Sequence, residues 1–141
     1  MLKETVIKYR TEEYNLNCAE AIIYAANEEY NLNLKEETLK VMSGFGGGMA
    51  TGDVCGVITG AIGVIGIMFT EVSGHKSPMV REMTRELIND FKEKLGYIKC
   101  VDLKKEYANV KRCTLMIETG AEILDNIILK EKQQSKLFKY M

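Results

Sequence analysis

The chain has 141 residues, 46% of them hydrophobic and 28% charged, which suits one hydrophobic core and a single domain over residues 1–141. Nineteen basic and twenty acidic residues give a formal charge of -1, which argues against a nucleic-acid or anionic membrane partner. The first ten residues mix charged and apolar side chains without the apolar run of a secretory signal, so we expect a cytoplasmic protein with reduced thiols.

The first half of the chain carries helix signals rather than strand signals. A polar helix is expected over about residues 3–13. The motif NCAE at residues 17–20 has an asparagine N-cap and a glutamate three residues later, which starts a second helix with Cys18 at its first position. This helix should extend to about residue 30. The same signal in NLKE at residues 33–36 predicts a short third helix ending near residue 42 or 43.

The middle of the chain predicts a loop followed by a buried helix. Glycines dominate residues 44–52, and each would cost about 1 kcal/mol against alanine in a helix, so a loop is expected. Asp53 is well placed to cap the next helix, which should run from Val54 to about Thr70. That helix has no charged side chain and should be the buried centre of the fold. Its sixteen residues from 54 to 69 fall short of the ~20 needed to span a membrane.

The glycines of this region indicate close packing rather than nucleotide binding. Residues 47–54 lack the Lys-Ser/Thr of a phosphate loop and follow a predicted helix instead of a strand, so no nucleotide cofactor is expected. Four glycines of the central helix should mark close approaches of neighbouring helices or of a ligand. Two of them, Gly56 and Gly60, are candidate cofactor-binding positions.

The second half of the chain adds further helices. Pro78 suits the start of a helix whose apolar residues recur every three or four positions until Gly96 stops it. Cys100 should follow in a loop, with Asp102 capping a short turn. The last helix should begin near residues 110–113, and the polar tail after residue 129 is suited to fraying or to contact with a second subunit in a homo-oligomer. The sequence therefore predicts an all-α fold, a compact bundle of about five to six helices around a buried glycine-rich central helix.

Four cysteines carry the chemistry that we expect from this chain, namely Cys18, Cys55, Cys100 and Cys113. Cys18 and Cys55 fall in predicted first helical turns, where unpaired N–H groups and the helix dipole favour the thiolate, so both thiols should be more acidic than a free cysteine. Cys113 also lies near a helix start, directly after two basic residues, whereas Cys100 sits in the expected loop. The competing interpretation is that some of these cysteines are small buried apolar groups.

The cysteine spacing leaves several chemistries open. No pair forms Cys-x-x-Cys, so any joint site must be assembled by the fold. Four converging thiolates suit an iron–sulfur cluster or zinc, whereas pairs suit reversible disulfides. His75 is the only histidine, which excludes a multi-histidine metal site.

The motif GDVCGVITGA at residues 52–61, with NCAE before it and Cys100 and Cys113 after it, resembles the family called C_GCAxxG_C_C. Val57 stands where the family's usual element has alanine. The resemblance implies a helical fold and redox activity. A similar domain occurs in split-Soret cytochromes in association with an iron–sulfur cluster. The chain lacks the Cys-x-x-Cys-His of haem attachment, so haem is not carried over.

Two hypotheses follow. In the first, the protein is an oxidoreductase or electron carrier that exchanges electrons with a redox partner protein or a small-molecule donor or acceptor. Cys18 and Cys55 would be the acidic pair, with Cys100 and Cys113 as resolving partners or as the remaining ligands of a cluster. The missing Cys-x-x-Cys favours the cluster slightly over dithiol chemistry. In the second, the thiolates hold a structural zinc ion or a subunit-interaction module and move no electrons.

Overall fold

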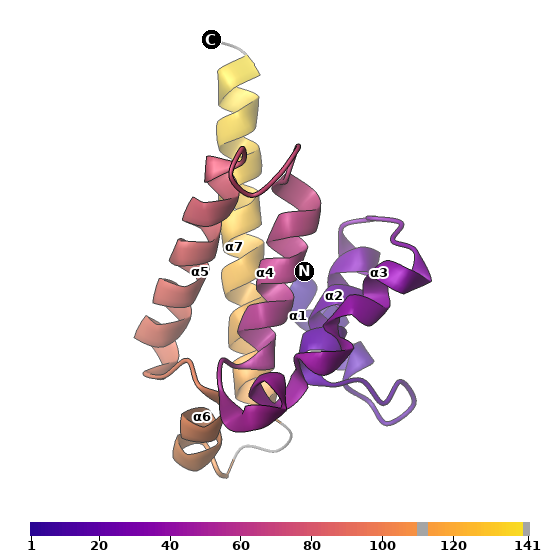
Figure 1. Ribbon diagram of the computed structural model, residues 1–141, viewed down its shortest axis with the longest axis vertical. Coiled ribbons are helices and arrows are strands. Elements are labelled where there is room, and N and C mark those ends of the chain that lie inside the picture. Colours follow the sequence, from indigo (N-terminus) through magenta and orange to yellow (C-terminus); the bar gives the residue numbers. More distant parts are fainter. Residues whose placement is uncertain (110–112, 140–141) are drawn as a thin grey trace.

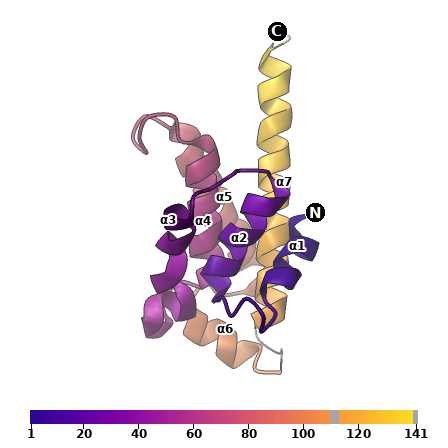
Figure 2. The same cartoon turned by 90° about the vertical axis from the view of Figure 1, so that its right-hand side faces the viewer.

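The computed structural model describes residues 1–109 and 113–139. Within that part of the chain, seven α-helices and two short helical turns form the fold (Figures 1 and 2). They are α1 (Leu2–Tyr9), α2 (Cys18–Glu29), α3 (Glu36–Lys40), η1 (Val41–Gly44), η2 (Gly48–Gly52), α4 (Gly56–Phe69), α5 (Pro78–Leu95), α6 (Cys100–Glu106) and α7 (Thr114–Lys139). The predicted all-α bundle is confirmed, with slightly more helices than the five to six expected.

The glycine-rich helix α4 is the buried centre of the bundle, as predicted. It packs against α2 on one side and against α5 and α7 on the other (Figure 1). Its apolar side chains supply the middle of the hydrophobic core, namely Val57, Ile58, Ala61, Val64 and Ile65. No helix among the described residues is both long and apolar enough to cross a membrane.

Two helices follow their sequence signals closely. The Asn17 side chain accepts a hydrogen bond from the Glu20 backbone N–H at 2.9 Å, and the Glu20 carboxylate accepts one from the Asn17 N–H at 3.1 Å. This capping box starts α2 at Cys18, as predicted. Helix α5 begins at Pro78 and ends before Gly96, which adopts the left-handed φ of 86° that favours glycine.

Other predicted boundaries are wrong. The first helix ends at Tyr9 rather than near residue 13. Asn33 is not an N-cap, because its φ of 53° is left-handed, and α3 instead begins at Glu36 after Lys35. At the other end of the chain, α7 continues to Lys139, so the predicted fraying is not seen as far as that residue. The predicted start of this helix at residues 110–112 lies outside the described part of the chain.

A buried carboxylate joins the first two helices to the last. Asp125 on α7 is only 4% exposed. Its Oδ2 accepts a hydrogen bond from the Leu2 backbone N–H at 2.8 Å, and its Oδ1 accepts one from the Tyr30 hydroxyl. Burial, followed by the hydrogen bond to Asp125, raises the pKa of Tyr30, so this hydroxyl stays protonated. The network holds α1 and the end of α2 against α7.

The glycines of α4 differ in what surrounds them. A Cβ added at Gly60 would lie 2.7 Å from the Ala19 carbonyl oxygen, and one added at Gly56 would lie 2.6 Å from the Cys18 Sγ. These two positions let the α2 backbone approach α4. Gly66 has no neighbour within 4 Å of such a Cβ, so the predicted close approach at Gly66 is wrong.

We predict opposite effects for alanine at two glycines of α4, one in its first half and one in its second half. Gly60→Ala should destabilise the protein by about 2 kcal/mol or more, because backbone of α2 blocks the new methyl group. Gly66→Ala should stabilise it by about 0.5–1 kcal/mol, because alanine favours the helix and nothing opposes it. Urea unfolding of both variants measures these changes, and equal effects would contradict the close contact of α2 with α4.

Candidate functional site

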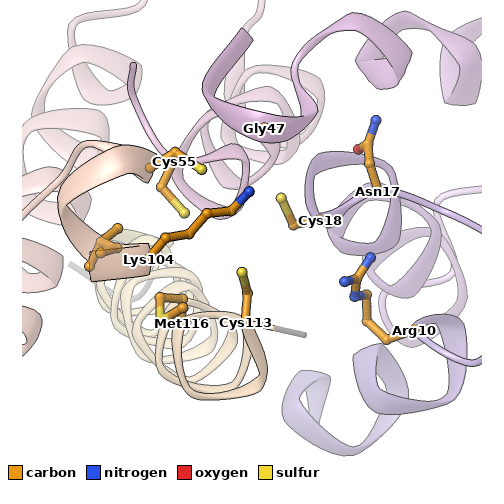
Figure 3. Close-up of a pocket in the computed structure, with 10 residues that line it drawn as sticks. Arg10, Asn17, Cys18, Gly47, Cys55, Lys104, Cys113 and Met116 are labelled. Atoms are coloured by element: carbon orange, nitrogen blue, oxygen red, sulfur yellow. The ribbon is translucent and has the colours of Figure 1, made fainter. Parts of the chain in front are cut away.

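All four cysteines line one cavity. Helix α6, which begins with Cys100, lies at the lower end of the bundle in Figure 1. The cavity volume is about 170 Å³, roughly ten times the space that one water molecule needs. The other residues that line it are Arg10, Asn17, Gly47, Leu103, Lys104 and Met116 (Figure 3). The sequence predicted a site assembled by the fold from distant segments, and the cysteines do meet there.

Each cysteine lies at the amino end of a different helix. Cys18 is the first residue of α2, Cys55 directly precedes α4, and Cys113 directly precedes α7, as the sequence indicated for these three. Cys100 is the first residue of α6, so its predicted loop position is wrong. Helix amino ends carry unpaired N–H groups and a partial positive charge, so the cavity receives this charge from several directions.

A short antiparallel pairing brings Cys55 beside Cys100. Residue Val54 pairs with Lys99 across an isolated β-bridge. The Cys55 N–H donates to the Ile98 carbonyl at 2.8 Å, and the Cys100 N–H donates to the Asp53 carbonyl at 2.7 Å. This extended pairing delays the start of α4 to Gly56. The predicted capping role of the Asp53 side chain is therefore wrong, because the backbone of Asp53 is used for the pairing instead.

The glycine-rich segment closes one side of the cavity. Gly47 lines the cavity. The sequence predicted a loop over residues 44–52, but the structure forms the short helical turn η2 over residues 48–52, interrupted by left-handed residues. A Cβ added at Gly48 would lie 2.4 Å from the Asp53 carbonyl oxygen and 2.8 Å from the Cys100 Cβ. Glycine at position 48 is thus required for the close approach of this segment to residues 53–55 and to Cys100.

Two non-glycine residues in this segment have left-handed backbone angles. Met49 has φ 59° and ψ 38°, and Ala50 has φ 61° and ψ 7°, directly after the left-handed Gly47 and Gly48. Cys113, on the far side of the cavity, also has a left-handed φ of 59°. Each such residue costs roughly 1–2 kcal/mol in the folded state. The cavity is therefore bordered by strained backbone on two sides.

The buried thiol of Cys55 is much less acidic than predicted. It is 5% exposed. Burial and, to a smaller extent, the neighbouring Cys18 raise the pKa of Cys55 to about 12, although the Val57 and Ile58 N–H groups at the start of α4 favour the thiolate. The expectation of an acidic Cys55 is wrong because the cost of burying a negative charge exceeds the stabilisation that the helix start provides.

The pKa of Cys113 is raised too, first by burial and then by Cys18 and Cys100. Lys104 and Arg10 act in the opposite direction and favour its thiolate. The basic residues at 111 and 112 that the sequence singled out lie outside the described part of the chain. Cys113 and Cys18 are both partly exposed, and they therefore form the more accessible side of the thiol set.

The described residues show no compact donor set for a single metal ion. All four thiols are free. No three described His, Cys, Asp or Glu side chains lie close enough together to hold one metal ion. A tetrahedral zinc ion with Zn–S bonds of about 2.3 Å needs its sulfur ligands roughly 4 Å apart.

Two candidate positions from the sequence lie outside the cavity lining. Gly56 and Gly60 serve the contact between α2 and α4, and their role in binding a cofactor stays a prediction. His75 is exposed in the turn before α5 and does not line the cavity either.

Sequence reasoning missed Arg10 and Lys104 as lining residues. Lys104 follows Cys100 by four residues, which places both on one face of a helix. The spacing of four residues has this meaning only if a helix is predicted to begin at Cys100. The residue before it, Lys99, makes no side-chain capping hydrogen bond, so the sequence carries no cap signal for this helix start. Arg10 lies just beyond α1 and reaches the cavity only through the tertiary packing.

We predict that relieving the left-handed backbone stabilises the protein. Ala50→Gly should raise the free energy of unfolding by about 1 kcal/mol, because glycine adopts this conformation without a Cβ clash and the exposed Ala50 side chain contributes little packing. Ala26→Gly, inside the right-handed helix α2, should lower it by about 1 kcal/mol or more. Thermal unfolding of the two variants checks the opposite signs.

We also predict that Cys55 reacts slowly in the metal-free protein. A thiol with a pKa near 12 holds on the order of a thousandfold less thiolate at pH 8 than one with the ordinary value of 9.0. Iodoacetamide labelling of a variant that retains only Cys55, with serine at the other three positions, should be slower than free cysteine by at least a hundredfold. The matched variant that retains only Cys113 should react faster, and the reverse order would contradict the burial of Cys55.

A comparison with known families matches the part of the chain that contains the cysteines. The family model described as "Putative redox-active protein (C_GCAxxG_C_C)" matches residues 16–127, a span that includes all four cysteines of the cavity. No curated protein and no solved structure matches the chain. The match covers most of the chain, and so the protein belongs to the C_GCAxxG_C_C family of redox-active proteins.

Proposed function

We propose that the four thiols together bind an iron–sulfur cluster and that the protein uses it for electron transfer, as an electron carrier or oxidoreductase. The observation that carries this proposal is that Cys18, Cys55, Cys100 and Cys113, from four segments of the chain, line one cavity. Such a cluster supplies reversible one-electron chemistry when it is bound.

The protonation of the thiols favours a metal-bound role. A free Cys55 stays protonated near neutral pH, which makes it a poor nucleophile for disulfide exchange. Metal coordination deprotonates a thiol outright, because the cation replaces the solvation that burial has removed. The same burial that disfavours dithiol chemistry at Cys55 is therefore compatible with ligation.

The surroundings of the thiols fit an anionic thiolate site. The helix amino ends, Arg10 and Lys104 all present positive charge to the cavity, which offsets the negative charge of several thiolates. Leu103 and Met116 line it with apolar surface and limit the access of water to bound sulfur. Their proposed role is to stabilise and shield the thiolate ligands.

The accessible side of the cavity suggests where electrons enter and leave. Cys55 and Cys100 are buried, whereas Cys18 and Cys113 are partly exposed. Electron exchange with a redox partner protein or a small-molecule donor or acceptor would take place on the Cys18 and Cys113 side. The alternative is that the thiols hold a structural zinc ion or a subunit-interaction module and move no electrons.

We predict that the protein purified without oxygen, or reconstituted with iron and sulfide, contains iron and sulfide in equal amounts and has visible charge-transfer bands. Cys55→Ser and Cys100→Ser should lose most of the bound iron, because each removes a buried ligand. Met116→Leu, which keeps the apolar volume at the same cavity, should retain it.

Metal analysis of the same sample separates the alternatives. A colourless, metal-free protein whose thiols cycle with a disulfide would contradict the cluster and favour dithiol chemistry. Zinc alone, with unfolding by a chelator, would favour the structural module.

A further inference from the structure

The charged groups that line the thiol cavity all have the same sign. Arg10 and Lys104 are its charged lining residues, and none of the described residues that line it is an aspartate or glutamate. The remaining lining consists of four thiols, apolar side chains, a glycine and the amide of Asn17, whose oxygen and nitrogen are occupied by Glu20 and Ser43. The polar character of the cavity is therefore cationic.

Lys104 reaches into the cavity without a carboxylate partner. It lies four residues after Cys100 on α6, and Leu103 beside it is buried at the same cavity. Figure 3 shows the Lys104 side chain extended across the cavity between Cys55 and Cys113 toward Cys18. Among the described residues, its ammonium group makes no ion pair and no hydrogen bond. Lys104 is exposed to solvent, and its charge also faces the cavity that it lines.

Arg10 faces Lys104 from the opposite side. Its Nη1 donates a hydrogen bond to the Leu16 carbonyl, which fixes the guanidinium at the edge of the cavity. In Figure 3 it points inward from the end of α1, on the Cys18 and Cys113 side. Two cations on opposite sides of a partly enclosed cavity attract an anion and repel a cation, and low-dielectric walls strengthen this effect.

We propose that, in the metal-free protein, this cavity binds small anions between Arg10 and Lys104, beside Cys18 and Cys113. The chemical class is a compact carboxylate, sulfonate or inorganic oxyanion. The inference does not rest on the proposed function, because Arg10 and Lys104 line the cavity of the metal-free protein, whereas with a cluster bound they would balance the charge of the thiolates.

The selectivity can be measured on the metal-free reduced protein with two methanethiosulfonate reagents, one carrying a sulfonate and the other a trimethylammonium group. The ratio of their rates at one thiol is independent of how much thiolate that thiol holds, so it reports the local potential alone. Mass spectrometry identifies the labelled cysteine. The sulfonate should react faster at Cys18 or Cys113, relative to the same ratio for free cysteine.

Three variants test the assignment to Lys104. Lys104→Gln should lower the rate ratio about fivefold, from the loss of one charge at a separation of several ångströms. Lys104→Arg should preserve it. Lys105→Gln removes the same charge from the neighbouring residue, which is equally classed as exposed but does not line the cavity, and should leave the ratio nearly unchanged. Equal effects of Lys104→Gln and Lys105→Gln would overturn the proposal, since only general surface charge would then be at work.

A competition experiment tests binding itself. Sodium sulfate should slow labelling by the sulfonate reagent in a saturable way, beyond sodium chloride of equal ionic strength, and Lys104→Gln should abolish this protection. Identical effects of the two salts would overturn the anion site. If the protein takes up no iron but its metal-free form is selective for anions, only the cluster proposal is contradicted. If the protein binds a cluster but its metal-free form shows no selectivity, only the anion-site proposal is contradicted.

Discussion

The backbones of α2 and α4 approach each other so closely at Gly56 and Gly60 that no added side chain fits between them, and this contact fixes where the first two cysteines lie. The Cys18 sulfur sits directly over Gly56, the first residue after Cys55. Because both helices begin at this contact, their cysteines arrive at the same end of the bundle. The other two cysteines are then added by the pairing of residues 53–55 with 98–100 and by the start of α7.

The strained backbone at the cavity lowers the stability of the folded protein, and the hydrophobic core of the bundle offsets this loss. Left-handed backbone at Met49, Ala50 and Cys113 makes the metal-free site a region of stored unfavourable energy. The core around α4 supplies the stability that offsets it, through apolar side chains from α2, α5 and α7. A metal-bound or anion-bound site would recover part of that cost, since binding to the folded state stabilises it.

The charge at the cavity has two physical sources that act together. Helix amino ends give fixed partial charges that do not depend on side-chain conformation. Lys104 and Arg10 add full charges on opposite sides, and none of the described residues that line the cavity is acidic. The net formal charge of the chain, -1, gives no hint of this local field, because acidic residues elsewhere balance it.

The sequence alone determined the helices whose signals are local: the capping box that starts α2 at Cys18, the amphipathic α5 between Pro78 and Gly96, and the uncharged, glycine-rich α4. These signals depend on residues within one or two turns of each other, so they can be recognised without the fold. The sequence also singled out the four cysteines, as thiols of one joint site. Only the tertiary structure decided that they line one cavity, that Cys55 is buried and weakly acidic, and that Cys100 starts a helix. It also decided that Lys104 and Arg10 face the thiols, because burial, charge and the 53–55 pairing all depend on segments far apart in the chain.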